Sequence, residues 1–406
     1  MKKIYFSAAI IFIIFLKLFI SLIMHDFFIA PDSYKYLSVA KNIAAGNGMK
    51  NSDGQPHIKV GILYGIFLSL FFKSGISNYS AIIFIQSVIL GFLLFWIVIK
   101  IYARFYKIKP RDYWILLIII TFYPPIFGAS FFLLTEMLFM VLFYSSLHFY
   151  FLFTEKKIYT HLIFSAMLAG ASALTRSVIF LFPFITASIL ILYSIFKKQN
   201  FIKTVFNSIV FLFFFSLVIM PLSLRNYLVF KKIIPISISG GSIYGGYLAA
   251  KFGEENFWGL PQLKEFSKIK NDIERDEKLK ILDKQFLNDN FKEFAKYSFI
   301  KFFRFFYEIP GSKKLLSNNK LILIVLTLIH FSVLLLSAAG IFLLLLLQKR
   351  QNIFLPIIFI GYTAFIHSIS FANGRYRLPI EPLLLIFAVI SLNYLMDKYN
   401  IFNKKT

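Results

Sequence analysis

Long apolar runs alternate with short basic segments from one end of the chain to the other. A run of about 18 or more apolar residues is long enough to cross a bilayer as a helix. We therefore predict an all-α integral membrane protein, a polytopic bundle of about 10–11 hydrophobic helices. The predicted spans are Ile4–Met24, Ser80–Ala103, Tyr113–Tyr123, Phe131–Phe153, Ile158–Leu174, Val178–Phe196, Val205–Leu224, Leu321–Leu347, Ile353–Ser370 and Leu378–Met396.

Three details refine this pattern. Pro124 and Pro125 break the third span, because proline has no amide hydrogen to donate and its ring clashes with the preceding helical turn. Val60–Phe72 is apolar but too short to cross, so we expect it to dip into the outer leaflet. Lys17 lies within the first span, where we expect its side chain to reach outward to the interface rather than face the bundle.

The basic residues determine the predicted orientation. The formal net charge is +25, and the lysines and arginines gather in alternate short loops, as the positive-inside rule requires. This placement favours a membrane protein over a nucleic-acid-binding one, with both termini in the cytoplasm. The first span is longer than a signal-peptide core and is expected to be retained. The chain has no cysteine, which excludes disulfides and thiolate metal sites.

This topology divides the chain into three predicted parts. Residues 1–224 form a membrane module that includes the first outer loop, residues 25–59. Residues 225–319 form a small extracytoplasmic region, and residues 320–406 form the last membrane helices.

The first outer loop carries a carboxylate at the start of a predicted interfacial helix. Tyr36, Ala40, Ile43 and Ala44 recur at helical spacing after Asp32, and two glycines follow. Other polar residues are predicted on the same side of the membrane. Together with Asp32 and Tyr36 they are His57, Lys59, Glu136, Arg176, Arg225, Arg375 and Arg377.

These residue types fit glycosyl transfer from a lipid phosphate. A carboxylate can accept the proton of an attacking hydroxyl while the anomeric bond breaks. Arginine forks match phosphate oxygens and can hold the leaving group. A single carboxylate with direct attack predicts inversion at the anomeric carbon. Structural roles remain alternatives: Asp32 as a helix N-cap, Glu136 in an ion pair, the arginines as interface anchors.

Several short motifs, in order, resemble the GT-C glycosyltransferases, and within them family 39, which includes protein O-mannosyltransferases and aminoarabinose transferases. They are Pro31-Asp32-Ser33, Tyr123-Pro124, Leu134-Thr135-Glu136, Leu174-Thr175-Arg176, Leu224-Arg225-Asn226-Tyr227, Pro235-Ile236-Ser237 with Gly240-Gly241, and Arg375-Tyr376-Arg377-Leu378-Pro379.

The resemblance implies an inverting transferase that uses a polyprenyl-phosphate sugar, with its active site facing away from the cytoplasm of a bacterial inner membrane. It makes Asp32 the catalytic base and Arg176, Arg225, Arg375 and Arg377 the candidates for donor phosphate. His57, Lys59, Glu136 and Tyr36 are then acceptor-binding or site-shaping residues.

The sequence departs from the family in one informative place. Ser33 follows Asp32 where protein mannosyltransferases have an Asp-Glu pair, so a glycan or lipid acceptor is favoured over protein. No cofactor is expected, and no ligand set indicates a divalent metal. An O-antigen-type polymerase or ligase, and a flippase or other transporter of lipid-linked sugars, are the alternative functions.

Overall fold

The structure is a computed structural model that describes residues 2–198, 200–238, 242–253, 257–269, 271–309, 319–347 and 350–399. In these residues every regular element is an α- or 3₁₀-helix, apart from one isolated bridge between Lys50 and Pro56. The all-α prediction is therefore confirmed. The chain forms two compact units, Met1–Ser237 and Ile238–Thr406, which are described separately below.

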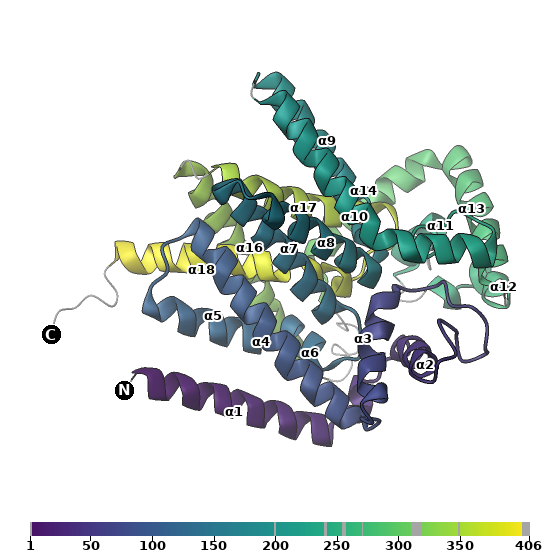
Figure 1. Ribbon diagram of the computed structural model, residues 1–406, viewed down its shortest axis with the longest axis horizontal. Coiled ribbons are helices and arrows are strands. Elements are labelled where there is room, and N and C mark those ends of the chain that lie inside the picture. Colours follow the sequence, from purple (N-terminus) through teal and green to yellow (C-terminus); the bar gives the residue numbers. More distant parts are fainter. Residues whose placement is uncertain are drawn as a thin grey trace. The chain divides into compact units, whose positions relative to one another are not determined.

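The first unit contains a bundle of long helices and the short helices α2 and α3 (Figure 1). Helix α7 lies between α4 and α8, and α8 in turn packs against α10. Helix α1 runs along α4, and the short helices α2 and α3 pair with each other. The elements are α1 (Lys2–Ile23), η1 (His25–Phe28), α2 (Ser33–Ala44), α3 (Ile62–Lys73), α4 (Tyr79–Phe105), α5 (Pro110–Phe122), α6 (Pro124–Phe131), α7 (Glu136–Lys156), α8 (Tyr159–Thr175), η2 (Ser177–Ile179), α9 (Phe182–Phe196) and α10 (Phe201–Phe230).

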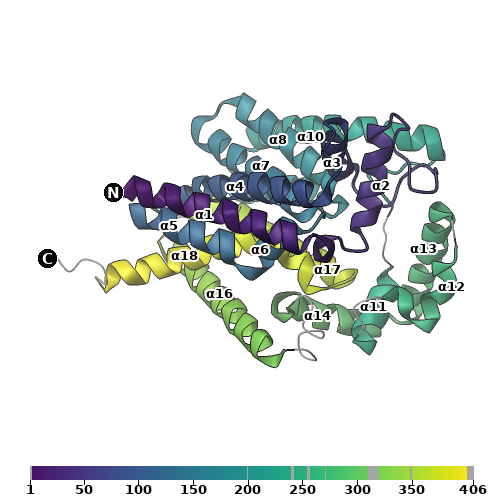
Figure 2. The ribbon, with the colours of Figure 1, turned by 90° about the horizontal axis from the view of Figure 1, so that it is seen from below.

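The second unit contains the apolar helices α16, α17 and α18 and a smaller helical cluster (Figure 2). Helix α16 packs along α18, and α14 packs on α17. Tyr247, Leu263 and Phe286 form the centre of the cluster built by α11–α14. The elements are α11 (Ile243–Phe252), η3 (Phe257–Gly259), η4 (Pro261–Leu263), α12 (Lys264–Ser267), α13 (Asp272–Asp289), α14 (Phe291–Tyr307), α16 (Lys320–Leu346), α17 (Arg350–Ile369), η5 (Gly374–Ile380) and α18 (Glu381–Lys398). The predicted Gly240-Gly241 motif lies outside the described residues.

Each of the ten predicted spans corresponds to a helix or to a bent pair of helices. Among the described residues, seven helices are long and apolar enough to cross a membrane, and the pair α5 and α6 would make an eighth. Two predicted spans are shorter helices: α8 has 17 residues, and the apolar part of α17 is Ile353–Ile369. The chain is therefore a helical membrane protein, as predicted.

The break in the third span occurs where the sequence placed it. Helix α5 ends at Phe122, Tyr123 adopts an extended conformation, and α6 begins at Pro124 with a bend of 60°. The residue before a proline is pushed out of the helical region, which accounts for the extended Tyr123. The bend turns α6 back toward α4, against which it packs.

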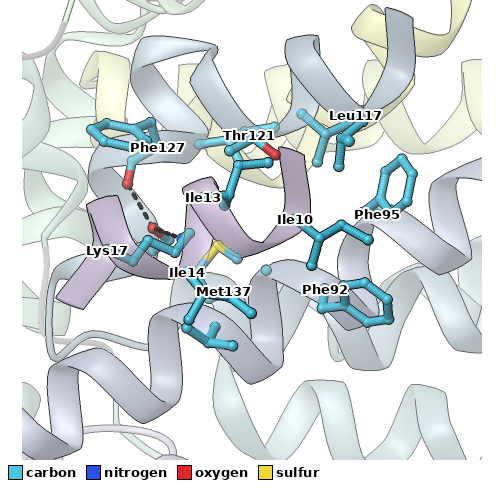
Figure 3. Close-up of a pocket in the computed structure, with 15 residues that line it drawn as sticks. Ile10, Ile13, Ile14, Lys17, Phe92, Phe95, Leu117, Thr121, Phe127 and Met137 are labelled. Carbon is cyan, nitrogen blue, oxygen red and sulfur yellow. Dashed lines mark hydrogen bonds between the residues drawn. The ribbon is translucent and has the colours of Figure 1, made fainter. Parts of the chain in front are cut away.

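Lys17 corrects one prediction, because its side chain faces the bundle instead of the interface. It is buried, and its ammonium donates to the Ser87 carbonyl and the Ser130 hydroxyl, both at 3.0 Å. The ammonium also lies 5.0 Å from the centre of the Phe131 ring. Figure 3 shows the side chain at the edge of a largely apolar cavity lined by α1, α4, α5, α6 and Met137 of α7. Two acceptors and an aromatic face compensate for the water that the buried ammonium loses.

Candidate functional site

Asp32 stands at the N-cap position of α2, but its side chain makes no capping hydrogen bond. Ser33 instead stabilises the turn, since its hydroxyl accepts from the Ala30 amide at 3.0 Å. The Asp32 carboxylate accepts a hydrogen bond from Lys35 Nζ at 2.8 Å, and both side chains are about half exposed. The alternative that Asp32 serves only as a helix cap is thus wrong.

Helix α2 forms as the sequence predicted and is held in place by α3. Tyr36 and Ala40 lie on its buried face, and the Tyr36 ring meets the Tyr64 ring edge-on at 5.2 Å. The helix ends before Gly46 and Gly48, which have φ of 79° and 76°. Glycine adopts this left-handed conformation without steric cost, so the pair ends the helix.

A buried polar chain connects this helix pair to the bundle. The Tyr64 hydroxyl donates to Gln86 Oε1 at 2.6 Å, and Gln86 Nε2 donates to the Phe132 carbonyl at 2.9 Å. Both side chains are fully buried. Sequence reasoning missed them, although a glutamine inside an apolar span is the signal that could have revealed the chain.

Glu136 lies four residues after Phe132, and its position corrects the prediction that it lies inside a membrane span. The sequence placed Glu136 inside a span, but it is the first residue of α7, because the chain is extended at Phe132 after α6. A carboxylate is favourable at a helix N-terminus. Glu136 forms an ion pair with Arg176, which follows the last residue of α8; Arg176 Nη1 and Glu136 Oε1 are 3.3 Å apart. Glu136 also interacts electrostatically with Tyr64.

Arg225 and His57 fix the far end of the first loop. Arg225 extends from α10 and donates to the carbonyls of His57 and Met49 at 2.7 and 3.1 Å. The His57 ring is buried, with one nitrogen 2.7 Å from Asn51 Oδ1 and the other 3.1 Å from the Val60 carbonyl. Arg225 therefore stabilises the loop, whatever else it contacts.

The loop then passes directly over the end of α8. A side chain at Gly61 would overlap the Leu174 and Thr175 carbonyls, so only glycine permits this approach. At the other end of the loop, the Leu133 amide donates to the Phe28 carbonyl at 3.3 Å. Residues 28–61 are thus attached to the ends of α6, α8 and α10. Within the first unit, Glu136 pairs with Arg176, Arg225 binds the His57 carbonyl, and His57 and Lys59 line one cavity. Asp32 pairs with Lys35, and Tyr36 packs on Tyr64.

Arg375 and Arg377 belong to the second unit, where the predicted turn is the 3₁₀-helix η5. Arg375 is partly exposed, whereas Arg377 is buried. Arg377 Nε donates to Glu381 at 2.7 Å, and Nη1 donates to the carbonyls of three residues, Phe305, Phe306 and Glu308, at 2.8–2.9 Å. Its guanidinium is therefore used to join α14, η5 and α18.

No group of three or more histidine, cysteine or acidic side chains that could hold a metal ion occurs in the described parts of the chain.

No protein-family profile matches the sequence, and no curated protein is significantly similar to it. The fold is similar to that of the archaeal oligosaccharyltransferase AglB from Archaeoglobus fulgidus, solved with an inhibitory peptide and a dolichol-phosphate. The two chains are 12% identical, with a TM-score of 0.56 over 99% of this chain. This chain spans about half (53%) of that protein.

ArnT from Cupriavidus metallidurans is a weaker match. Its apo structure and its undecaprenyl phosphate complex give TM-scores of 0.44 and 0.40, at 12% identity. They cover 99% and 98% of this chain and 80% and 79% of ArnT. The similarity to AglB shows that the two chains share a fold, and it shows no more than the fold.

Proposed function

We propose that the chain is an inverting membrane glycosyltransferase, which moves a hexose or pentose from a polyprenyl-phosphate sugar to an envelope glycan or lipid. The observation that carries the proposal is Asp32, a carboxylate at the start of α2 that its own helix does not use as a cap. The loop that holds it is attached at both ends to the helix bundle. The fold shared with an oligosaccharyltransferase solved with dolichol-phosphate supports the same reaction class.

In the proposed reaction, Asp32 accepts the proton of an acceptor hydroxyl while its oxygen attacks the anomeric carbon. The bond from that carbon to the phosphate oxygen breaks, and polyprenyl phosphate leaves. Attack from the face opposite the phosphate inverts the anomeric centre. The leaving phosphate gains negative charge, which nearby cations stabilise.

Among the four arginines predicted for the donor phosphate, we retain Arg176, which belongs to the same unit as Asp32. Arg176 directly follows Thr175, whose carbonyl Gly61 closely approaches, and its pairing with Glu136 would orient the guanidinium. Arg225 and Arg377 are instead assigned to stabilising the loop and η5, because their guanidinium groups bind backbone carbonyls. Glu136, Tyr36 and His57 shape the site.

We further propose that the protein lies in a bacterial cytoplasmic membrane, with both termini in the cytoplasm and the first loop outside. The distribution of basic residues supports this orientation. Residues 1–224 would carry catalysis, residues 225–319 would form the small extracytoplasmic region, and residues 320–406 would form the last membrane helices.

The test is transfer of radiolabelled sugar from a panel of polyprenyl-phosphate sugars, in membranes from cells that lack the gene and carry a variant on a plasmid. We expect the wild type to transfer sugar and Asp32→Asn to transfer none, at equal protein levels. The matched control is Asp26→Asn, which removes a carboxylate that is 91% exposed and six positions away. It should retain full activity.

Full transfer by Asp32→Asn would remove Asp32 from the mechanism. If the wild type transfers no sugar but moves labelled lipid across liposome membranes, the protein is a transporter and the proposal is wrong. If it instead joins or ligates preassembled glycan repeats, the polymerase or ligase alternative is correct.

A further inference from the structure

A cavity of about 360 Å³ opens beside α2, between this helix and the rest of the first loop. Its volume is at the lower end of the range of about 300–1,000 Å³ for small-molecule sites. All of its lining residues belong to the first unit. His57, which is proposed above to shape the site, is one of them.

The lining is strongly basic. Lys35, Lys41 and Lys59 face it, against a single carboxylate, Asp53. Lys41 is held in place by Tyr79, whose hydroxyl accepts from Nζ at 2.9 Å. Three ammonium groups around one small cavity favour a ligand with negative charge.

The remaining lining groups suit a sugar. The Tyr34 and Tyr79 rings provide flat amphipathic surfaces, and Asn51 and Ser52 provide hydrogen-bonding groups. A few polar groups beside aromatic rings are typical of sites that orient a small polar ligand.

Lys35 connects the cavity to Asp32. It lines the cavity, and its ammonium lies 2.8 Å from Asp32 Oδ1. Ion pairs between half-exposed side chains are weak, because water screens the two charges. An anion bound in the cavity can therefore draw Lys35 away from Asp32 at little cost.

We propose that this cavity binds a saccharide carrying a carboxylate or a phosphate, and that Lys35 moves from Asp32 to the bound anion. On the basis of the glycosyltransferase function proposed above, this saccharide is part of the acceptor. Lys35 then acts as a positioning residue. The Lys35 ammonium is paired with the Asp32 carboxylate when the acceptor is absent, and this ion pair breaks when the acceptor binds.

Binding is tested without any transfer assay, by saturation-transfer NMR on the full chain in detergent. The probes are glucuronic acid, glucose 6-phosphate and neutral glucose. We expect at least one anionic probe to bind in a salt-sensitive manner and glucose not to bind. The two anions together show whether the carboxylate or the phosphate is preferred.

Substitutions locate the binding. Loss of a charge-assisted hydrogen bond should weaken it about tenfold in Lys41→Gln and Lys59→Gln. Lys50→Gln, an exposed position in the same loop that does not line the cavity, is the matched control. Unchanged melting temperatures show that the variants are folded. Equal binding of glucose, or an equal loss in Lys50→Gln, would overturn the proposal.

The release step is tested with the donor that supports transfer, in the absence of acceptor. Water can then attack the anomeric carbon, with Asp32 taking its proton and polyprenyl phosphate leaving. Lys35→Met should increase this hydrolysis several-fold, and adding Asp32→Asn should abolish the increase. A merely structural Lys35 would lower the rate. If no donor reacts even with wild type, the glycosyltransferase proposal and the release step fail together, while NMR still decides whether the cavity binds anionic sugars.

Discussion

Replacing Arg377 by glutamine should destabilise the second unit strongly, although the sequence alone predicted this residue to bind donor phosphate. Arg377 and Glu381 are each 1% exposed, and their ion pair has an N–O distance of 2.7 Å. Removing one partner of a buried pair typically costs about 3–5 kcal/mol, because the other charge remains buried. Three backbone carbonyls also lose their donor.

This loss of unfolding free energy can be measured as a decrease in the melting temperature of the full-length protein in detergent. At about 2–4 °C per kcal/mol for a domain of this size, we expect a decrease of roughly 10 °C. The same substitution at Arg375, two positions away and partly exposed, is the matched control and should change little. The double variant Arg377→Met, Glu381→Leu should recover most of the loss, since apolar residues can replace a buried pair.

One result would refute a structural role for Arg377. If Arg377→Gln melts within about 2 °C of wild type and mainly weakens use of the donor, the guanidinium acts on a ligand and its carbonyl contacts contribute little stability.

Three further predictions concern the loop, a buried lysine and metal dependence. Arg225→Ala should speed hydrogen exchange in residues 49–60 and raise the donor and acceptor requirements together, whereas a phosphate ligand would affect the donor alone. Lys301 is buried on α14, and burial lowers its pKa from 10.5 to about 8. The unfolded state therefore binds more protons between these values, and stability rises with pH from about 8 to 10.5. Relative to Lys301→Met, the wild-type melting temperature should rise over this range, and a constant difference would exclude the shift. Transfer should withstand EDTA, and a loss that Mg²⁺ or Mn²⁺ restores would contradict this expectation.

The sequence predicted those features that depend on local pattern. Apolar run length identified the spans, Pro124 located the break, and the spacing of Tyr36 and Ala40 identified the buried face of α2. Asp32 was selected as a carboxylate at the edge of a membrane segment in a motif that resembles the family, and its catalytic role stays a prediction. Each of these signals lies within a few residues of the feature it predicts.

The sequence could not identify the partners of polar groups when those partners are distant in the chain. Lys17 meets acceptors 70 and 113 positions later. Arg377 binds backbone carbonyls about 70 positions earlier, and a carbonyl has the same chemistry in every residue. Hydrophobic periodicity shows which face of a helix is apolar, but it does not show which helix supplies the acceptor. An arginine that binds phosphate and one that joins helices therefore look alike in the sequence.

The contacts of Lys17 have a consequence for how the protein is made. Ribosomes synthesise α1 before α4 and α6, so the acceptors of Lys17 do not yet exist when α1 enters the membrane. An ammonium without partners in the bilayer reaches for the interface. We therefore expect the nascent α1 to hold Lys17 outward and to rotate it inward when α6 arrives. The interfacial lysine that the sequence predicted would then describe the biosynthetic intermediate, and the buried lysine the finished protein.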